Sequence, residues 1–263
     1  MTNFFNIDKN EFEAPIWRYM DMSKFIDFVE KSSIFFPIAD LFEDKFEGIH
    51  NAIGENDFYD INNVGTIIKT DSISDERQKT NTELLKSFIS HNINTIRQSV
   101  GISCWHFSEQ ESHAMWKIFL SSNEGVAIRT SVSAIINSIE ATNENQNIYV
   151  GKVKYIDYKK NKMPIDNMFN PLFYKNIYFE HEKELRILLY EMNNLNNTTF
   201  DANNLKTIHA PGTSLKVNYK EVIKEIKISP YAPETFIDRV KKICIENYKL
   251  NIPINRSLIE LRS

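Results

Sequence analysis

The residues with the clearest chemical potential lie at 180–186, where the chain reads Glu-His-Glu-Lys-Glu-Leu-Arg. A strand here would place every second residue on one face, and its charged face would carry Glu180, Glu182, Glu184 and Arg186. Crowded carboxylates repel, which raises the pKa of at least one of them unless a cation such as Arg186 intervenes. Glu182 and Glu184 are therefore candidate catalytic residues. The alternative is a solvated acidic face that forms ordinary cross-strand pairs.

A second polar group contains His106, Glu109, Glu111 and His113. Glu109 and His113 could share a helix face, but the sequence has no His-Glu-x-x-His motif and no third ligand nearby. Ser108 and Glu111 have the spacing of a capping box, which explains the run as the start of a helix. We therefore predict no metal site at these residues.

Two further groups are weaker candidates. Cys104 and His106 are two residues apart on a predicted strand, about 7 Å, which is too far for a direct thiolate–imidazolium pair. Glu43, Asp44 and Glu47 could coordinate a cation, and the alternative is that they order an irregular loop.

The composition argues against several classes of protein. The chain has 263 residues with 31 Lys and Arg against 35 Asp and Glu, so no broad basic field indicates nucleic-acid binding. The alternating lysines at 152–162 are typical of a solvated strand face. Cys104 and Cys244 lack disulfide or metal spacing, which favours a reducing compartment. With no signal sequence and no apolar run long enough to cross a bilayer, we expect a cytoplasmic protein without membrane contact.

Apolar periodicity predicts the elements that position these residues. The predicted helices cover 21–31, 75–99, 109–119, 132–139, 171–179 and 233–247. The predicted strands cover 16–20, 34–36, 100–105, 126–130, 148–156, 183–190, 215–219 and 225–229. This order favours a single α+β domain over residues 1–263, with a mixed, mostly antiparallel sheet and flanking helices. We expect the first six strands to share one cleft.

Several short motifs follow one another along the chain. They are Trp17-Arg18-Tyr19, Phe42-Glu43-Asp44-Lys45-Phe46-Glu47, Ser103-Cys104-Trp105, Met115-Trp116, Glu182-Lys183-Glu184-Leu185-Arg186 and Ile228-Ser229-Pro230. In this order they resemble a large family of bacterial cytoplasmic proteins known as a domain of unknown function, over nearly the whole chain. That resemblance implies a fold but no activity.

The same elements resemble, more distantly, the ADP-ribosyltransferase fold. In that fold an early strand supplies an Arg, a middle strand a Ser and a later strand a Glu-x-Glu pair. By position, the resemblance assigns these roles to Arg18, Ser103, and Glu182 with Glu184. The residue after Ser103 is a cysteine, not a second hydroxyl residue of the usual Ser-Thr-Ser run, so the hydroxyl role could instead fall to the pair at 130–131.

The resemblance further implies NAD as a substrate and no metal. Arg18 would bind the pyrophosphate, because its planar guanidinium matches phosphate oxygens. Ser103 would line the nicotinamide pocket, and Tyr19 or Trp105 would stack on the ring. One glutamate would stabilise an oxocarbenium-like centre and the other would position or deprotonate the acceptor.

Three functions follow as hypotheses. The first is an NAD-cleaving ADP-ribosyltransferase-like enzyme, acting as a bacterial toxin or phage-defence effector with a partner protein of a defence or toxin-antitoxin system. The second is a non-catalytic sensing or interaction module that has kept the fold. The third is a metal-dependent nuclease or hydrolase. The sequence does not identify the acceptor, which could be a small molecule or a macromolecule.

Overall fold

A computed structural model describes residues 2–42, 95–144, 146–158, 160–161, 163–164, 167, 169–191, 206–208 and 210–260. These residues form an α+β fold that is built on one large sheet. Its eight strands follow the order β1-β6-β9-β4-β2-β5-β11-β12. The two outermost pairs are parallel and the pairs between them are antiparallel. The predicted α+β class and mostly antiparallel sheet are therefore confirmed.

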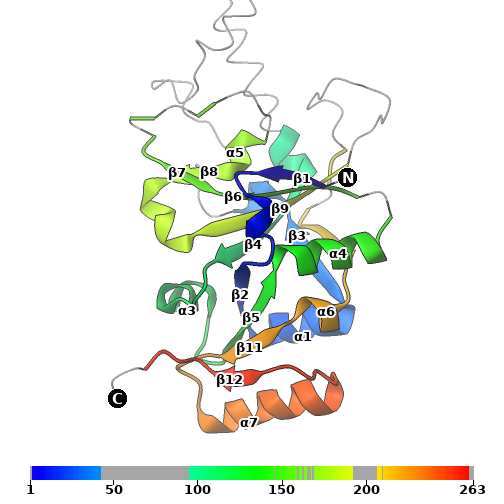
Figure 1. The fold of residues 1–263 in the computed structure, drawn as a ribbon, viewed down its shortest axis with the longest axis vertical. Coiled ribbons are helices and arrows are strands. Elements are labelled where there is room, and N and C mark those ends of the chain that lie inside the picture. The colour runs from blue at the N-terminus through cyan, green and yellow to red at the C-terminus, as the bar shows by residue number, and fades with distance from the viewer. Residues whose placement is uncertain are drawn as a thin grey trace, which may run out of the picture.

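The strands of the large sheet run one below the other through the molecule (Figure 1). They are β1 (Thr2–Phe5), β2 (Pro15–Asp21), β4 (Val100–Phe107), β5 (Gly125–Ser131), β6 (Asn147–Lys152), β9 (Glu184–Tyr190), β11 (Glu225–Ile228) and β12 (Ile254–Arg256). The three strands that carry Arg18, Ser103 and Glu184 are β2, β4 and β9, which are consecutive in this order. The sheet thus brings together strands that lie far apart in sequence.

Two smaller sheets accompany the large one. In the first, β3 (Ser33–Pro37) pairs with β10 (Gly212–Lys216) in the antiparallel direction. In the second, β7 (Lys154–Ile156) pairs with β8 (Tyr174–Asn176) in the parallel direction. The predicted single strand over 148–156 is therefore wrong in extent. The chain leaves the large sheet at Val153, whose N–H donates to the carbonyl of Glu184 at 2.9 Å.

Helices and a small sheet cover the two faces of the large sheet (Figure 1). One side carries α1 (Met22–Lys31), α4 (Val132–Thr142) and α6 (Tyr219–Val222), and α7 (Glu234–Lys242) packs into the same core before continuing as the π-helix Ile243–Asn247. The other side carries α3 (His113–Phe119), α5 (Asn170–Phe173) and the β7–β8 sheet. Short 3₁₀ helices occur at Lys9–Glu11, Ala39–Leu41 and Ile177–Glu182.

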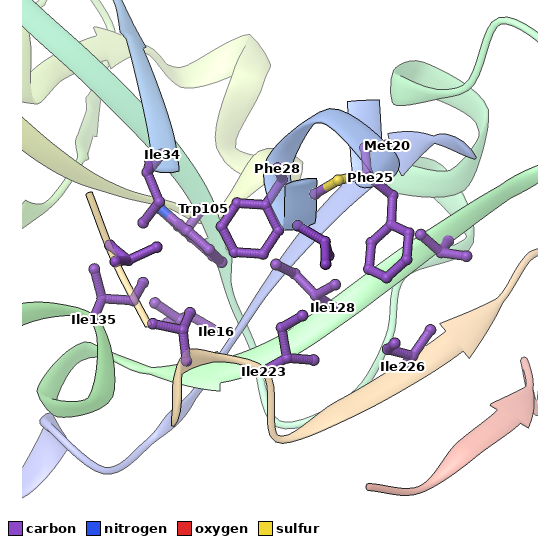
Figure 2. Packing of buried hydrophobic residues seen from close by; sticks show 14 of the residues in the cluster. Ile16, Met20, Phe25, Phe28, Ile34, Trp105, Ile128, Ile135, Ile223 and Ile226 are labelled. Carbon is purple, nitrogen blue, oxygen red and sulfur yellow. The ribbon is translucent and has the colours of Figure 1, made fainter. Parts of the chain in front are cut away.

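The main core lies between the large sheet and α1, α4 and α7. Every second residue of β2 and β4 points into it, including Ile16, Met20 and Trp105. Figure 2 shows Trp105 packed beside Phe28 and Ile34, and only 2% of its surface is exposed. Strand β9 is buried at all its positions because both faces of the sheet are covered there.

Several predicted elements differ from the structure. Residues 180–186 do not form one strand, since Ile177–Glu182 is a 3₁₀ helix, Lys183 has φ of 42°, and β9 begins at Glu184. The predicted capping box at Ser108 is also wrong. The helix starts later, at α3, where the Ser112 hydroxyl accepts from the N–H of Met115 at 3.4 Å.

The remaining helix predictions have mixed outcomes. The helix predicted over 171–179 is instead α5, β8 and the start of a 3₁₀ helix. Of the helix predicted over 75–99, residues 95–99 are helical and the others lie outside the described residues. The helices predicted to begin near 21 and at 132 are α1 and α4, whose N-cap residues are Asp21 and Ser131. The Ser131 hydroxyl accepts from the N–H of Ala134 at 3.3 Å.

Candidate functional site

The middle of the large sheet contains a gap in its pairing. Strand β2 pairs with β4 at only two positions, Ile16 with Phe107 and Trp17 with His106. Along the rest of their lengths the two strands diverge, although each pairs fully with its other neighbour. A pocket of about 950 Å³ lies at this divergence and is lined by residues 17–20 of β2 and 104–106 of β4. Its volume is at the upper end of the range for small-molecule sites.

The divergence allows the two faces of the sheet to meet in one pocket. By strand alternation, Arg18 lies on the face of Ile16 and Met20, which is the face of α1. Glu184 lies on the opposite face, across from His106 in the strand register. Both Arg18 and Glu184 nevertheless line the pocket. Of the six strands expected to share one cleft, all contribute residues to the pocket except the predicted strand at 148–156, so the prediction is wrong for that strand. The pocket receives side chains from both faces of the sheet, a geometry that the sequence pattern did not indicate.

A buried network of four charged residues borders the pocket, which is lined by three of them, Lys175, Glu182 and Glu184. Lys175 of β8 donates from Nζ to Glu182 Oε2 at 2.6 Å and to Glu184 Oε1 at 2.8 Å. Arg186 donates from Nε to Glu184 Oε2 at 2.6 Å and from Nη1 to the carbonyl of Leu172 at 2.6 Å. We call Lys175, Glu182, Glu184 and Arg186 the pocket cluster. Of the glutamates on the predicted acidic face, Glu182 and Glu184 are withdrawn from water and contact a cation, whereas Glu180 is exposed.

The pKa values of the two carboxyl groups in the pocket cluster are shifted in opposite directions. Burial, together with a hydrogen bond to Glu182, raises the pKa of Glu184 to about 8, and Lys175 opposes this shift. Burial also acts to raise the pKa of Glu182, but hydrogen bonds with Glu184 and Lys175 outweigh it and lower that pKa below its usual value. The two pKa shifts therefore point in opposite directions, upward for Glu184 and downward for Glu182.

Arg18 points toward the hydroxyl and indole groups predicted beside it. Its Nη1 donates to Ser103 Oγ at 3.1 Å, and its guanidinium lies 5.4 Å from the centre of the Trp105 ring. The indole N–H of Trp105 donates to the same hydroxyl at 3.0 Å. Ser103 thus aligns Arg18 with Trp105 and does not itself line the pocket. The residues proposed as alternatives, Thr130 and Ser131, do not line it either.

The aromatic residues predicted to stack on a ligand are engaged elsewhere. The Tyr19 hydroxyl accepts from the N–H of Ser112 at 2.7 Å, and its ring packs edge-on against Trp116 at 4.9 Å. Trp105 belongs to the main core, as described above. Both reach the pocket with part of their surface only. Both line the pocket, so the stacking of Tyr19 or Trp105 on a ligand ring stays a prediction.

Cys104 and His106 lie on β4 between the two sides of the pocket. Burial, followed by the charge of Glu184, raises the pKa of Cys104 well above its usual value, so the group is a thiol at neutral pH. Both Arg18 and Glu184 act on this pKa, which places Cys104 within electrostatic range of each. His106 donates from Nδ1 to the carbonyl of Glu182 at 2.6 Å, and burial lowers its pKa. His106 therefore anchors the 3₁₀ helix as a neutral ring.

Sequence reasoning missed Lys175 and the apolar rim of the pocket. Lys175 is the only charged residue between positions 168 and 179, which are otherwise mostly aromatic and apolar, and this isolation is a signal of a buried partner. The rim is formed by apolar side chains of several elements, among them Phe28, Phe35, Met115, Ile118 and Phe119. The pocket thus combines the buried charges of Lys175, Glu182 and Glu184 with these apolar side chains, and the exposed Lys24 and Asp27 of α1 also line it.

The other polar groups of the sequence do not converge on a metal site. His113 bonds through Nε2 to the hydroxyl of Tyr231 at 2.6 Å, and Glu111 accepts from the indole of Trp116 and the N–H of Leu258. In the part of the chain that the structure describes, no group of three or more His, Cys, Asp or Glu side chains could hold a metal ion. The acidic residues 43, 44 and 47 lie outside the described residues.

Comparisons with known proteins add no family or neighbour. A scan against protein-family models, a search of curated proteins and a search of solved structures each found no match. Among the described residues, no helix has the length and apolar character needed to cross a membrane.

Proposed function

We propose that the pocket at the β2–β4 divergence binds NAD and cleaves it as an ADP-ribosyltransferase-like enzyme. One observation carries the proposal: Arg18 and the Glu182–Glu184 pair, which come from separate elements, line the same pocket. Arg18 and the aromatic and apolar side chains that line the pocket suit a ligand that joins phosphates to flat rings. The volume of about 950 Å³ accommodates a ligand of dinucleotide size.

The chemistry assigns different tasks to the two glutamates. The bond between the ribose C1 and the nicotinamide nitrogen breaks, and its electron pair leaves with the ring as neutral nicotinamide. The positive charge that develops on the ribose faces the negative charge of Glu182. Water or an acceptor hydroxyl then attacks C1, and its proton passes to Glu182. Glu184, whose pKa is raised, is hydrogen-bonded to Glu182 and would hold it in position.

Arg18 supports the opposite part of the ligand. Its guanidinium is held by Ser103 and Trp105, so it is oriented before a ligand arrives. Phosphate oxygens match its planar donors. Because Arg18 and the glutamates come from opposite faces of the sheet, the ligand would thread through the divergence between β2 and β4. Cys104 would lie beside the middle of the ligand, between Arg18 and the glutamates.

The family and the setting are part of the same proposal. The motif residues Arg18, Trp105, Met115 and Glu184 converge on one pocket, which supports membership in the bacterial family of unknown function. We propose a cytoplasmic toxin or phage-defence effector. A metal-dependent nuclease has less support, because the ammonium group of Lys175 occupies the space between the carboxylates.

A non-catalytic binding module is the second candidate, and one observation favours it. Both oxygens of Glu184 are engaged by cations, Lys175 on one and Arg186 on the other. A carboxyl group held in this way is also what a purely structural network would contain. The module would bind NAD or a related ligand without turnover.

Release of nicotinamide from NAD, measured by chromatography, separates the two candidates. Glu182→Gln should reduce the rate at least about 100-fold, since it removes the charge that stabilises the transition state. Glu225→Gln is the matched control, because Glu225 is also paired with a strand lysine, Lys227 at 3.0 Å, but lies away from the pocket. Unchanged turnover in Glu182→Gln contradicts the enzyme. NAD binding without any wild-type turnover favours the module.

A further inference from the structure

Lys175 is buried in a position that demands an explanation. Its side chain is 6% exposed, and β8, which carries it, is only three residues long. Burying an ammonium group costs several kcal/mol unless partners compensate for the lost hydration. The partners are Glu182 and Glu184, and the ring of Phe179 lies 4.7 Å from Nζ. The short strand β8, which pairs with β7 in a small sheet, therefore places its one lysine where it lines the pocket.

Glu182 and Glu184 depend on Lys175 to different degrees. Glu184 has a second cation, Arg186, which is itself fixed by the carbonyl of Leu172. Glu182 forms its ion pair with Lys175, and its side chain is 12% exposed toward the pocket. Removing Lys175 would leave Glu184 with Arg186 and would take from Glu182 the ion pair that the structure describes. The lysine thus acts mainly on the carboxylate that remains accessible.

We propose that Lys175 is a positioning residue of the site, whose ammonium group clamps the two glutamates together and keeps Glu182 negatively charged and turned toward the ligand. This inference rests on the proposed function, because the clamped carboxylate matters for catalysis only if a cationic centre forms beside it. Lys175 itself does not touch the reacting atoms. It acts through Glu182.

Other charged and titratable groups face the pocket cluster and must be constant in any test. They are Arg18 of β2, Cys104 and His106 of β4, Tyr155 of β7 and His181 of the 3₁₀ helix. The Tyr155 hydroxyl accepts from the N–H of Glu184 at 2.7 Å, so it fixes the start of β9. None of these residues changes when Lys175 is substituted. A difference between variants therefore reports the lysine.

The first experiment follows the glutamate carboxyl carbons by ¹³C NMR during a pH titration without NAD. Lys175→Met should raise the titration midpoint of Glu182 by about one pH unit or more, because the nearby cation is lost. Lys175→Arg should keep the midpoint close to that of the wild type. Lys227→Met is the matched control, since Lys227 is also a buried strand lysine paired with a glutamate at 3.0 Å, and it should change nothing here.

The second experiment measures NAD turnover against pH in the same variants. The acidic limb of the Lys175→Met profile should move upward by the same amount as the NMR midpoint, while Lys175→Arg restores the wild-type limb. A folded Lys175→Met protein with an unshifted Glu182 midpoint overturns the proposal. If this variant does not fold, Lys175→Gln, which keeps a hydrogen-bonding amide, is expected to show the same upward shift, and an unshifted midpoint there overturns it equally.

The two readouts separate the failure of this inference from that of the proposed function. The NMR titration contains no NAD, so it decides the role of Lys175 even if the wild-type protein turns over no NAD. Absence of turnover would count against the enzyme alone. A wild-type enzyme that is active, with a pH profile insensitive to Lys175→Met, would count against the positioning role alone.

Discussion

Two lysine–glutamate clusters in this fold use the same residue types in different ways. In the pocket cluster, one lysine serves two carboxylates and the charges come from β8, the 3₁₀ helix and β9. The second cluster lies on β11, where Lys227 and Glu225 are two residues apart and share a strand face at 3.0 Å. Arg129 of β5 is 3.9 Å from the same carboxylate. We call Lys227 and Glu225 the β11 pair.

The two clusters differ in how exposed their side chains are and in how many carboxylates share each lysine. The carboxylate of the β11 pair is 19% exposed, so water can solvate it and the pair is an ordinary surface-proximal contact. In the pocket cluster Glu184 and Arg186 are 9% and 0% exposed, and two carboxylates compete for one lysine. Crowding of like charges away from water is typical of functional sites, because a structural pair needs only one partner of each sign.

The largest expected difference between the clusters is in stability. Lys175→Met should lower the free energy of unfolding by about 3 kcal/mol at pH 7, because it takes from the buried Glu182 carboxylate its ion pair and leaves Glu184 with Arg186 alone. Lys227→Met should cost about 1 kcal/mol or less. Urea unfolding followed by circular dichroism measures both. Equal losses in the two variants would remove the energetic distinction between the clusters.

The second expected difference concerns pH. The pKa of Glu184 is raised to about 8 from a usual value of 4.5, so the native protein holds a proton that the unfolded chain releases between these values. This contribution of Glu184 to stability is present below pH 4.5 and is lost as the pH rises toward 8. Over that window the free energy of unfolding of the wild type should fall relative to Glu184→Gln.

The smallest expected effect is on cysteine reactivity. Cys104 lines the pocket and Cys244 is completely buried, and burial raises the pKa of both thiols. A maleimide should therefore modify Cys104 slowly and leave Cys244 unmodified in the native protein. Saturating NAD should slow the reaction of Cys104 further by covering it. Mass spectrometry of peptides gives both rates, and equal reactivity of the two cysteines would contradict the pocket geometry.

The sequence predicts the strands of the large sheet better than the site itself. Periodicity identifies β2, β4 and β5 to within about two residues, because each packs a regular apolar face into a core. The run at 180–186 shows why the site is harder to predict. Its alternation is typical of a strand, yet the left-handed backbone of Lys183 separates Glu182 from Glu184, so the two reach Lys175 from different elements.

The pairing gap between β2 and β4 also has no sequence signal. By strand alternation Arg18 and Glu184 belong to opposite faces of the sheet, and continuous pairing of β2 with β4 would keep them apart. The register shows that these two strands pair at only two positions, and both side chains line the pocket. The role of Lys175 in the site could not be predicted from the sequence for a related reason. Its partners are separated from it by a chain reversal through the 3₁₀ helix, and no local spacing rule relates them.

The central claim is that the pocket at the β2–β4 divergence binds NAD, and a thermal-shift titration tests it most directly. Ligand at about 100 times its dissociation constant adds roughly 2.7 kcal/mol to the stability of the folded state, so binding is visible without turnover. The matched variants are Arg18→Ala and Arg129→Ala, because Arg129 lies over the Trp17 ring at 5.9 Å much as Arg18 lies over Trp105. We predict that NAD stabilises the wild type and Arg129→Ala, and that Arg18→Ala loses most of the shift. No stabilisation of the wild type by NAD, or an equal shift in the two arginine variants, would contradict the claim.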